Sequence, residues 1–364
     1  MAQKSNSLSQ LALQKFKKNF WGVLSLGIII GIGFIAVFAY VIAPDNSQNA
    51  NQMHLSIHSK SPGFKVDMLR MPSGIENNQS FISKTFFGVV NNETEIPISS
   101  YHATDSTLHY IEYASDGLKG VEKSIDLNVF PKGDFTPYVY KQTFLFGTDK
   151  YGRDLLSRVL VGSRISFFIG FVAVFISLFL GIIMGSLAGY FGGKVDAVVM
   201  WIINVTWSIP TLLLVIAITL VLGKGFWQVF IAVGITMWVE VARVVRGQII
   251  SVKEMQYVTA AKALGYTHFR IITKHILPNI MAPIIVISAA NFAAAILIES
   301  GLSFLGIGAQ PPMASWGAMI KDHYNYIILG KPYLAMIPGV CIMILVMAFM
   351  LIGNALRDAL DVKN

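Results

Sequence analysis

Hydrophobic residues in this chain gather into long runs, instead of the alternating or one-sided patterns that are typical of soluble domains. A helix needs about 20 mostly apolar residues to cross the hydrocarbon core of a bilayer. Six runs reach that length, at residues 20–43, 165–190, 197–222, 226–245, 280–300 and 333–353. We therefore predict an all-α integral membrane protein with six transmembrane helices, and the third helix can be kinked at Pro210.

Basic residues beside these runs predict the orientation of the chain. Lysines 15, 17 and 18 precede the first run, and the segment between the fourth and fifth runs is rich in Lys and Arg, with Glu254 as its only acid. Short basic segments stay on the cytoplasmic side, so both segments and both chain termini should be cytoplasmic. Three arginines before the second run, on the predicted outer side, fit this rule badly: Arg153, Arg158 and Arg164.

The segment between the first and second runs has a different character. Residues 44–142 are rich in Asn, Ser, Thr and Asp and include short β-prone pieces. These pieces lie at residues 85–90, 107–113, 125–130 and 138–146. Because aromatic residues recur throughout, a small, partly β extracytoplasmic insert domain is favoured over a poorly ordered linker. Residues 1–19 would form a cytoplasmic segment and residues 20–43 the first transmembrane helix.

The composition agrees with a membrane protein and excludes several other classes. Hydrophobic residues make up 54% of the 364 positions and charged residues only 13%, about half the charged share of a soluble domain. The formal charge of +8 favours contact with anionic membrane lipid over nucleic acid, for which there is no recognisable binding motif. The single cysteine, Cys341, excludes a disulfide within the chain.

Residues 257–279, in the basic segment, read as two short helices joined by a turn. Tyr257, Ala261 and Leu264 would share one face of the first helix. Gly265 is a natural residue to follow its C-terminus, and Thr267 can cap the second helix.

The second helix would place Phe269, Ile272 and Ile276 on an apolar face, and Pro278 would close the unit. An apolar helix pair outside the bilayer needs a partner to cover it, and a groove in another protein is the natural candidate.

The spacing of Ala260-Ala261, Gly265 and Leu277-Pro278 resembles the EAA loop of bacterial ATP-binding-cassette (ABC) importer permeases. The resemblance implies that a loop at about residues 245–279 fits into a cleft of a separate ATPase subunit. Thr259 stands where that motif usually has Glu. The residues that the resemblance assigns to coupling are Thr259, Ala260, Ala261, Leu264, Gly265, Phe269, Ile272, Leu277 and Pro278.

Other motifs resemble those of the C-type permeases of oligopeptide and dipeptide importers. They are FGTDKYGRDLLSR at 146–158, GYFGGKVD at 189–196, VRGQIIS at 245–251, LSFLGIGAQPP at 302–312 and SWG at 315–317. The resemblance covers the N-terminal helix and residues 144–361, and it makes residues 143–364 the permease core. The insert at 44–142 is longer than the usual connection in that family.

The resemblance implies a bacterial cytoplasmic-membrane importer with several chains. Its other parts would be a second, B-type permease, two ATPase subunits that bind ATP and Mg²⁺, and an external substrate-binding lipoprotein that delivers peptide. This chain has no G-x-x-x-x-G-K-[ST] phosphate loop, nucleophile elbow or H-E-x-x-H motif. We therefore expect it to be neither an enzyme nor the holder of a cofactor. Alternatives are an importer of another solute such as a nickel chelate, a membrane sensor, or an ion-coupled secondary transporter.

A few polar residues in the predicted helices allow two interpretations. Glu299 and Asn291 are costly to place in lipid and should face protein or water, so they either line the translocation path or stabilise helix packing. Asn204 is expected to form a hydrogen bond between helices, and Glu240 to pair with Arg243. The insert also holds four histidines, which we interpret as surface residues and not as a metal site: His54, His58, His102 and His109.

Overall fold

The computed structural model describes residues 8–73, 79–90, 93–115, 118–223 and 225–361. The first residues of the predicted cytoplasmic segment 1–19 lie outside these ranges. The chain divides into two compact units. Unit 1 comprises residues 1–33, 165–310 and 340–364, and unit 2 comprises residues 34–164 and 311–339.

Within the described residues, five helical stretches are long and apolar enough to cross a membrane, and a bent pair of helices can form a sixth crossing. The five are α2 (Phe20–Val37), α5 (Leu155–Phe191), α8 (Phe226–Val252), the stretch His268–Phe304, which includes α11 (Met281–Phe304), and α13 (Tyr333–Leu360). The bent pair is α6 (Gly193–Trp207) and α7 (Thr211–Leu222). All six predicted runs are therefore found, and the fold class is confirmed.

The third predicted run is not one straight helix. Helices α6 and α7 meet at an angle of 91°. The break falls at residues 208–210, where Pro210 stands immediately before α7. Proline supplies no backbone N–H and disfavours helical geometry in the residue before it, so the helix stops and restarts. The predicted kink is confirmed, and it is sharper than a bend within a continuous helix.

Helix α5 begins ten residues before the predicted start at Ile165. It has 37 residues, which corresponds to about 55 Å at 1.5 Å per residue, well beyond the roughly 30 Å of a hydrocarbon core. The first turns, up to Arg164, belong to unit 2 and the remainder to unit 1. The predicted start is too late because the prediction followed the apolar run alone. The helix also includes Arg158 and Arg164, whose side chains bind partners in unit 2.

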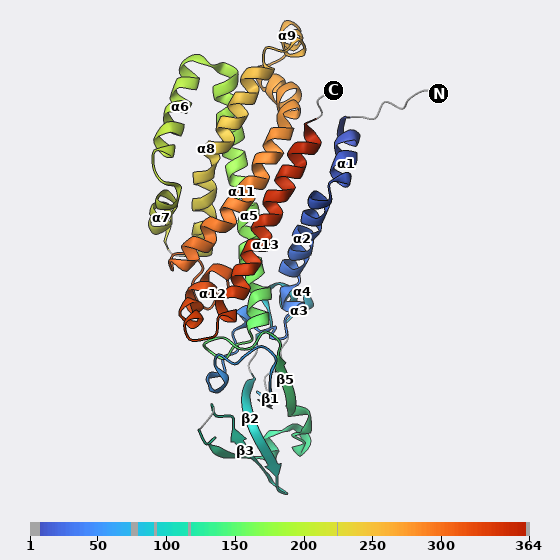
Figure 1. The fold of residues 1–364 in the computed structure, drawn as a ribbon, viewed down its shortest axis with the longest axis vertical. Helices are drawn as coiled ribbons and strands as arrows, with labels where there is room; N and C mark the ends of the chain where they lie inside the picture. The colour runs from blue at the N-terminus through green and yellow to red at the C-terminus, as the bar shows by residue number, and fades with distance from the viewer. Residues whose placement is uncertain (1–7, 74–78, 91–92, 116–117, 224, 362–364) are drawn as a thin grey trace, which may run out of the picture. The chain divides into compact units, whose positions relative to one another are not determined.

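Within unit 1, α5 packs closely against α8 along a row of glycines. A Cβ atom built at Gly181 would lie 2.5 Å from the Val241 Cβ, and one at Gly185 would lie 2.6 Å from the Ala242 carbonyl oxygen. At Gly189 the Arg246 carbonyl oxygen would be 2.9 Å away. This G-x-x-x-G-x-x-x-G spacing lets two membrane helices approach to backbone contact. Figure 1 shows α5, α8, α11 and α13 side by side in this unit.

The remaining helices of unit 1 are short or lie at its ends. Helix α1 (Leu8–Lys18) precedes α2, and Phe16 packs against Ala355 and Ala359 of α13. Between α8 and α11 the chain forms α9 (Gln256–Ala263), α10 (His268–Arg270), a π-helical turn (Ile271–Ile276) and a 3₁₀ turn (Leu277–Ile280). Helix α9 lies at one end of the bundle (Figure 1).

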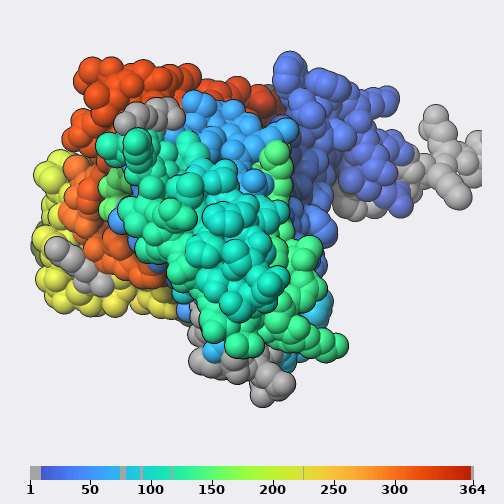
Figure 2. All heavy atoms as spheres, turned by 90° about the horizontal axis from the view of Figure 1, so that it is seen from below, coloured from blue at the N-terminus to red at the C-terminus, as the bar shows by residue number. Residues whose placement is uncertain are grey.

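Unit 2 is built on a five-stranded antiparallel sheet in the order β4-β3-β2-β1-β5. The strands are β1 (Phe64–Met71), β2 (Thr94–Ala103), β3 (Thr107–Glu112), β4 (Glu122–Asp126) and β5 (Val139–Phe144). One apolar cluster forms around Leu69, Leu108 and Phe130, and a second around Met68 and Phe144. In Figure 2 the side chains of this unit, coloured cyan to green, close into a continuous surface.

Apart from the parts of α2, α5 and α13 that fall in unit 2, its helices are short. They are α3 (Ala39–Ile42), α4 (Phe81–Phe87), α12 (Trp316–His323) and 3₁₀ turns at Gln48–Ala50, Leu55–Ile57, Leu127–Val129, Pro131–Gly133, Thr136–Tyr138 and Tyr324–Ile327. The insert is partly β, as expected, but the predicted strand at 85–90 is wrong because Ser80 caps a helix there and Gly88 ends it. Strands β1 and β2 were not predicted.

Candidate functional site

The loop between α8 and α11 adopts the predicted helix–turn–helix form. Helix α9 ends in a Schellman motif, in which the Gly265 N–H donates to the Lys262 carbonyl at 3.0 Å and the Tyr266 N–H donates to the Ala261 carbonyl at 3.2 Å. Gly265 has φ +74°, the left-handed conformation expected for it. The Thr267 side chain accepts a hydrogen bond from the Arg270 N–H and so caps α10. These local predictions are confirmed.

The predicted shared face of α9 is wrong. Ala261 is only 3% exposed and packs with Val258, Ile271 and Ile276 in the interior of unit 1, whereas Leu264 is 71% exposed. The inward side of this two-turn helix is set by Val258 and Ala261, which are three residues apart. Leu264 lies at the C-cap, where the backbone leaves the helix and turns the side chain outward.

The predicted apolar face of the second helix is also only partly buried. Phe269 is 77% exposed, Ile272 is half-buried and Ile276 is fully buried. Among the other predicted coupling residues, Thr259, Ala260 and Pro278 are exposed and Leu277 is half-buried. The exposed large apolar residues of the loop are Met255, Tyr257, Leu264 and Phe269. We call these four the apolar tip.

One contact from α5 and two contacts within the loop hold its second half. The Tyr190 hydroxyl of α5 lies 2.9 Å from His268 Nδ1, and the Tyr266 ring stacks on His275 with centroids 5.6 Å apart. The Arg270 guanidinium lies 4.0 Å from the centroid of the Tyr266 ring. Val258 and Ala261, buried in the interior cluster, hold the first half, so the apolar tip is presented on an ordered scaffold.

A salt bridge beneath the loop was missed by sequence reasoning. Arg246 of α8 binds Asp196 of α6 through both carboxylate oxygens, at 2.5 and 2.6 Å. The two residues lie in the GYFGGKVD and VRGQIIS motifs, and opposite charges at the ends of two apolar runs were the available signal. A bidentate Arg–carboxylate pair fixes geometry as well as contributing energy. It ties the first half of the bent helix pair to the helix that leads into the loop.

The predicted hydrogen bond of Asn204 is present, whereas the predicted ion pair of Glu240 is not. Arg243 Nη2 donates to Asn204 Oδ1 at 2.8 Å, which confirms an interhelical role for Asn204 between α6 and α8. The expected Glu240–Arg243 pair is wrong, because Arg243 instead stacks on the Trp207 ring at 3.5 Å and Glu240 is exposed.

Glu299 and Asn291 are both buried in unit 1. The Ser303 hydroxyl donates to Glu299 Oε1 at 2.7 Å and accepts from the Ala309 N–H at 3.3 Å. Glu299 is thereby linked through Ser303 to the turn after α11, which supports its packing interpretation. The Asn291 side-chain nitrogen has no hydrogen-bond partner among the described residues. A role of either residue in the translocation path stays a prediction.

The arginines that violated the orientation rule are structural residues of unit 2. Arg153 forms a buried ion pair with Asp149 at 2.6 Å and donates to Asn51 Oδ1 at 2.9 Å. Arg158 donates to the carbonyls of Asn49 and Pro312, at 3.1 and 3.4 Å. Because these charges are bound within the fold, they carry little information about membrane orientation.

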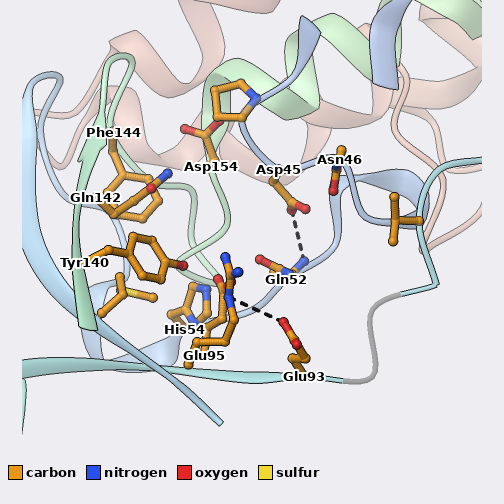
Figure 3. Close-up of a pocket in the computed structure, with 14 residues that line it drawn as sticks. Asp45, Asn46, Gln52, His54, Glu93, Glu95, Tyr140, Gln142, Phe144 and Asp154 are labelled. Carbon is orange, nitrogen blue, oxygen red and sulfur yellow. Dashed lines mark hydrogen bonds and ion pairs between the residues drawn. The ribbon is translucent and has the colours of Figure 1, made fainter. Parts of the chain in front are cut away.

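A pocket of about 330 Å³ lies in unit 2 between the sheet and residues 44–54 (Figure 3). Arg70 on its wall pairs with Glu95 at 3.1 Å and Glu93 at 3.4 Å. Burial lowers the pKa of His54 and raises the pKa of Asp154, whose carboxylate also accepts from Ser157. Two of the pocket's four carboxylates are thus paired with Arg70, while Asp45 and Asp154 accept hydrogen bonds from uncharged backbone and hydroxyl donors.

The histidines do not assemble into a metal site within the described part of the chain. His54 lines the pocket, whereas the His102 and His109 rings stack on each other across β2 and β3 at 4.9 Å. Among the described residues, no group of three or more His, Cys, Asp or Glu side chains is placed to hold a metal ion.

Comparison with known proteins defines the class of this chain. Residues 166–363 match the family model for the binding-protein-dependent transport system inner membrane component, and residues 7–62 match the N-terminal transmembrane domain of oligopeptide transport permease C. The chain belongs to the family of binding-protein-dependent transport system inner membrane components. It is therefore a multi-helix membrane permease of the ABC importer class.

Individual relatives place it more closely. The dipeptide transport system permease protein DppC of Bacillus subtilis (strain 168) is 44% identical over 218 residues, which are 60% of this chain and 68% of DppC. The oligopeptide transport system permease protein OppC of Escherichia coli (strain K12) is 43% identical over 219 residues, or 60% and 72% of the two chains. The glutathione transport system permease protein GsiD of Pectobacterium atrosepticum is 39% identical over 217 residues, or 60% and 72%. The family matches include the whole α8–α11 loop but leave residues 63–165 uncovered.

Proposed function

We propose that this chain is the permease subunit that carries peptides through an ABC importer. The observation that supports this most directly is its 44% and 43% identity to permeases named for dipeptide and oligopeptide transport. The membrane helices would form half of the path, and a second, B-type permease would form the other half. An external substrate-binding lipoprotein would deliver the peptide.

The energy would enter through the apolar tip. Four large apolar side chains on an ordered loop lose contact with water when a partner covers them, and this favours docking. We assign that role to two ATPase subunits that bind ATP and Mg²⁺, one of which docks on this loop. Movement of α9 would pass to the bundle through α8, because Val258 and Ala261 pack in one cluster with Val245 and Ile249. The loop and both termini would then be cytoplasmic.

The test is transport by the complete complex in proteoliposomes. Together with the second permease, the ATPases and the binding protein, this chain should support ATP-dependent uptake of a labelled peptide. Uptake should stop when the ATPases carry a disabled phosphate loop. A complex that hydrolyses ATP and imports a nickel chelate but no peptide would contradict the peptide assignment and leave the importer class intact.

Glutathione is a second candidate substrate because GsiD is 39% identical over a similar span. The same vesicles distinguish the two, since competition by unlabelled glutathione should leave peptide uptake unchanged if the first assignment is correct.

A further inference from the structure

Helix α4 (Phe81–Phe87) exposes most of its large apolar side chains. Phe81, Ile82, Phe86 and Phe87 are between 42% and 78% exposed, and only Thr85 of this helix is buried. Both ends of the helix are capped: the Ser80 side chain caps its start, and Gly88, at φ +79°, ends it. An ordered helix that carries four exposed apolar side chains on seven residues needs an apolar environment.

The position of α4 within unit 2 is fixed by the ends of two membrane helices. Arg164 Nη1 of α5 donates to the Phe86 carbonyl at 2.7 Å. The same guanidinium lies 4.9 Å from the centroid of the Tyr40 ring, on α3, and Tyr40 also lies against Gly88. Helix α3 follows α2 after one residue, so α4 is attached to the segment that follows α2 and to the last residue before the apolar part of α5.

The segment that packs against α4 also carries exposed apolar residues. Phe34 of α2 and Phe38, the residue between α2 and α3, are exposed with their rings 4.7 Å apart, and Val41 and Ile42 of α3 are also exposed. In the arrangement proposed below, these residues face lipid. Arg and Tyr side chains at the base of such a surface are typical of the membrane–water boundary.

We propose that α4 is an interfacial helix that lies in the boundary region of the bilayer and inserts Phe81, Ile82, Phe86 and Phe87 among the lipid chains. Short helices with large apolar residues bind this region in the plane of the membrane. The helix would fasten the base of the insert to the lipid surface at a fixed depth. This proposal requires only that α2 and α5 span the membrane, and it holds for either orientation of the chain and for any substrate.

Spin labels on single cysteines test this in the assembled complex in lipid nanodiscs. Phe81→Cys and Phe87→Cys would be made in a Cys341→Ser background, and collisions with oxygen and with a water-soluble nickel chelate would be measured. Phe34→Cys serves as the lipid-facing reference, and Ser106→Cys, in the exposed turn between β2 and β3, as the aqueous reference. We expect both α4 labels to follow Phe34, with frequent oxygen collisions and few nickel collisions.

Two outcomes would overturn the proposal. Nickel collisions equal to those at Ser106 would mean that α4 lies in water. Low collision rates with both reagents would mean that a protein partner covers it. Labelling at Ile82→Cys provides a third position if either phenylalanine variant fails to assemble, and an unchanged size-exclusion profile confirms that the labelled complex is intact.

Discussion

At the scale of single residues, the chain shows that one residue type can perform unrelated tasks. Arg246 holds Asp196 beneath the loop, Arg153 neutralises Asp149 in the interior of unit 2, and Arg164 reaches the α4 carbonyl. A rule that counts positive charges treats them alike. The partners of each guanidinium must be known before an arginine that sets the membrane orientation can be told from one that stabilises the fold.

Gly265→Val should weaken ATPase association while leaving the permease in the membrane. A Cβ at this position meets no atom within 4 Å, so the effect is backbone strain alone, on the order of 1–2 kcal/mol. Gly330 has nearly the same φ, +75°, and equally open surroundings, which makes Gly330→Val a matched control. Co-purification of the ATPases reports the result, and equal association of both variants would mean that the loop conformation does not matter for docking.

Phe269→Ser should reduce ATPase affinity because it removes the most exposed member of the apolar tip from the contact. Burying a phenylalanine side chain contributes about 1.5–3 kcal/mol, so the dissociation constant should rise by roughly ten- to a hundred-fold. Ala261, which sequence reasoning placed at the same contact, is buried within the chain and would disturb folding if enlarged. Lys262→Ala, on the exposed side of α9, is the control and should change binding far less.

Acid should destabilise unit 2 through His323 on α12. Its ring is buried, accepts the Lys150 N–H at Nε2 and donates from Nδ1 to the Met319 carbonyl. Burial lowers its pKa below 6.5. The unfolded chain therefore takes up the proton first, and stability is lost as the pH falls below about 6.5. Tm measured at about pH 7.5 and 5.5 should fall less in His323→Gln than in the parent. An equal drop in Tm in the variant and the parent would mean that other groups, such as His54, cause the loss of stability in acid.

At the scale of helices and strands, the sequence predicts best where one physical signal acts alone. All six apolar runs and the Gly265 turn were identified, because hydrophobic length and a left-handed turn leave clear patterns. Strands β1 and β2 were missed since Pro97 and scattered charges hide their alternation. The exposed and buried residues of the loop were only partly separated, because the burial of Ala261 depends on packing against α8 and the π-helical turn.

The close packing of α5 on α8 could not be predicted from the sequence alone. Its glycines at 181, 185 and 189 matter only once α8 is known to be the partner. Gly185→Ala should destabilise unit 1, because the new methyl carbon would lie 2.6 Å from the Ala242 carbonyl oxygen. Gly31→Ala on α2, where no atom lies within 4 Å, should be harmless or slightly stabilising. Thermal stability of the two variants in detergent distinguishes them, and a Gly185→Ala protein as stable as the parent would contradict close packing.

At the scale of the whole molecule, the two units present different kinds of surface. The α8–α11 loop presents apolar side chains on a rigid support, while the insert surrounds a polar pocket with a sheet that the family matches leave uncovered. The membrane helices and the loop are therefore the part shared with other importers. The insert is where this chain would acquire contacts of its own.

The proposed orientation places the insert outside the cell and the loop inside. Single cysteines in a Cys341→Ser background can be labelled with an impermeant maleimide on spheroplasts. Ser106 is exposed in the β2–β3 turn, and Lys274 is exposed in the loop, whereas Thr267 is unsuitable because its side chain caps α10. Ser106→Cys should react on intact spheroplasts, and Lys274→Cys only after they are permeabilised. Because the basic residues flanking α2 and α8 carry the assignment, the reverse labelling pattern would show that they do not set the topology, and the ATPases could not reach the apolar tip.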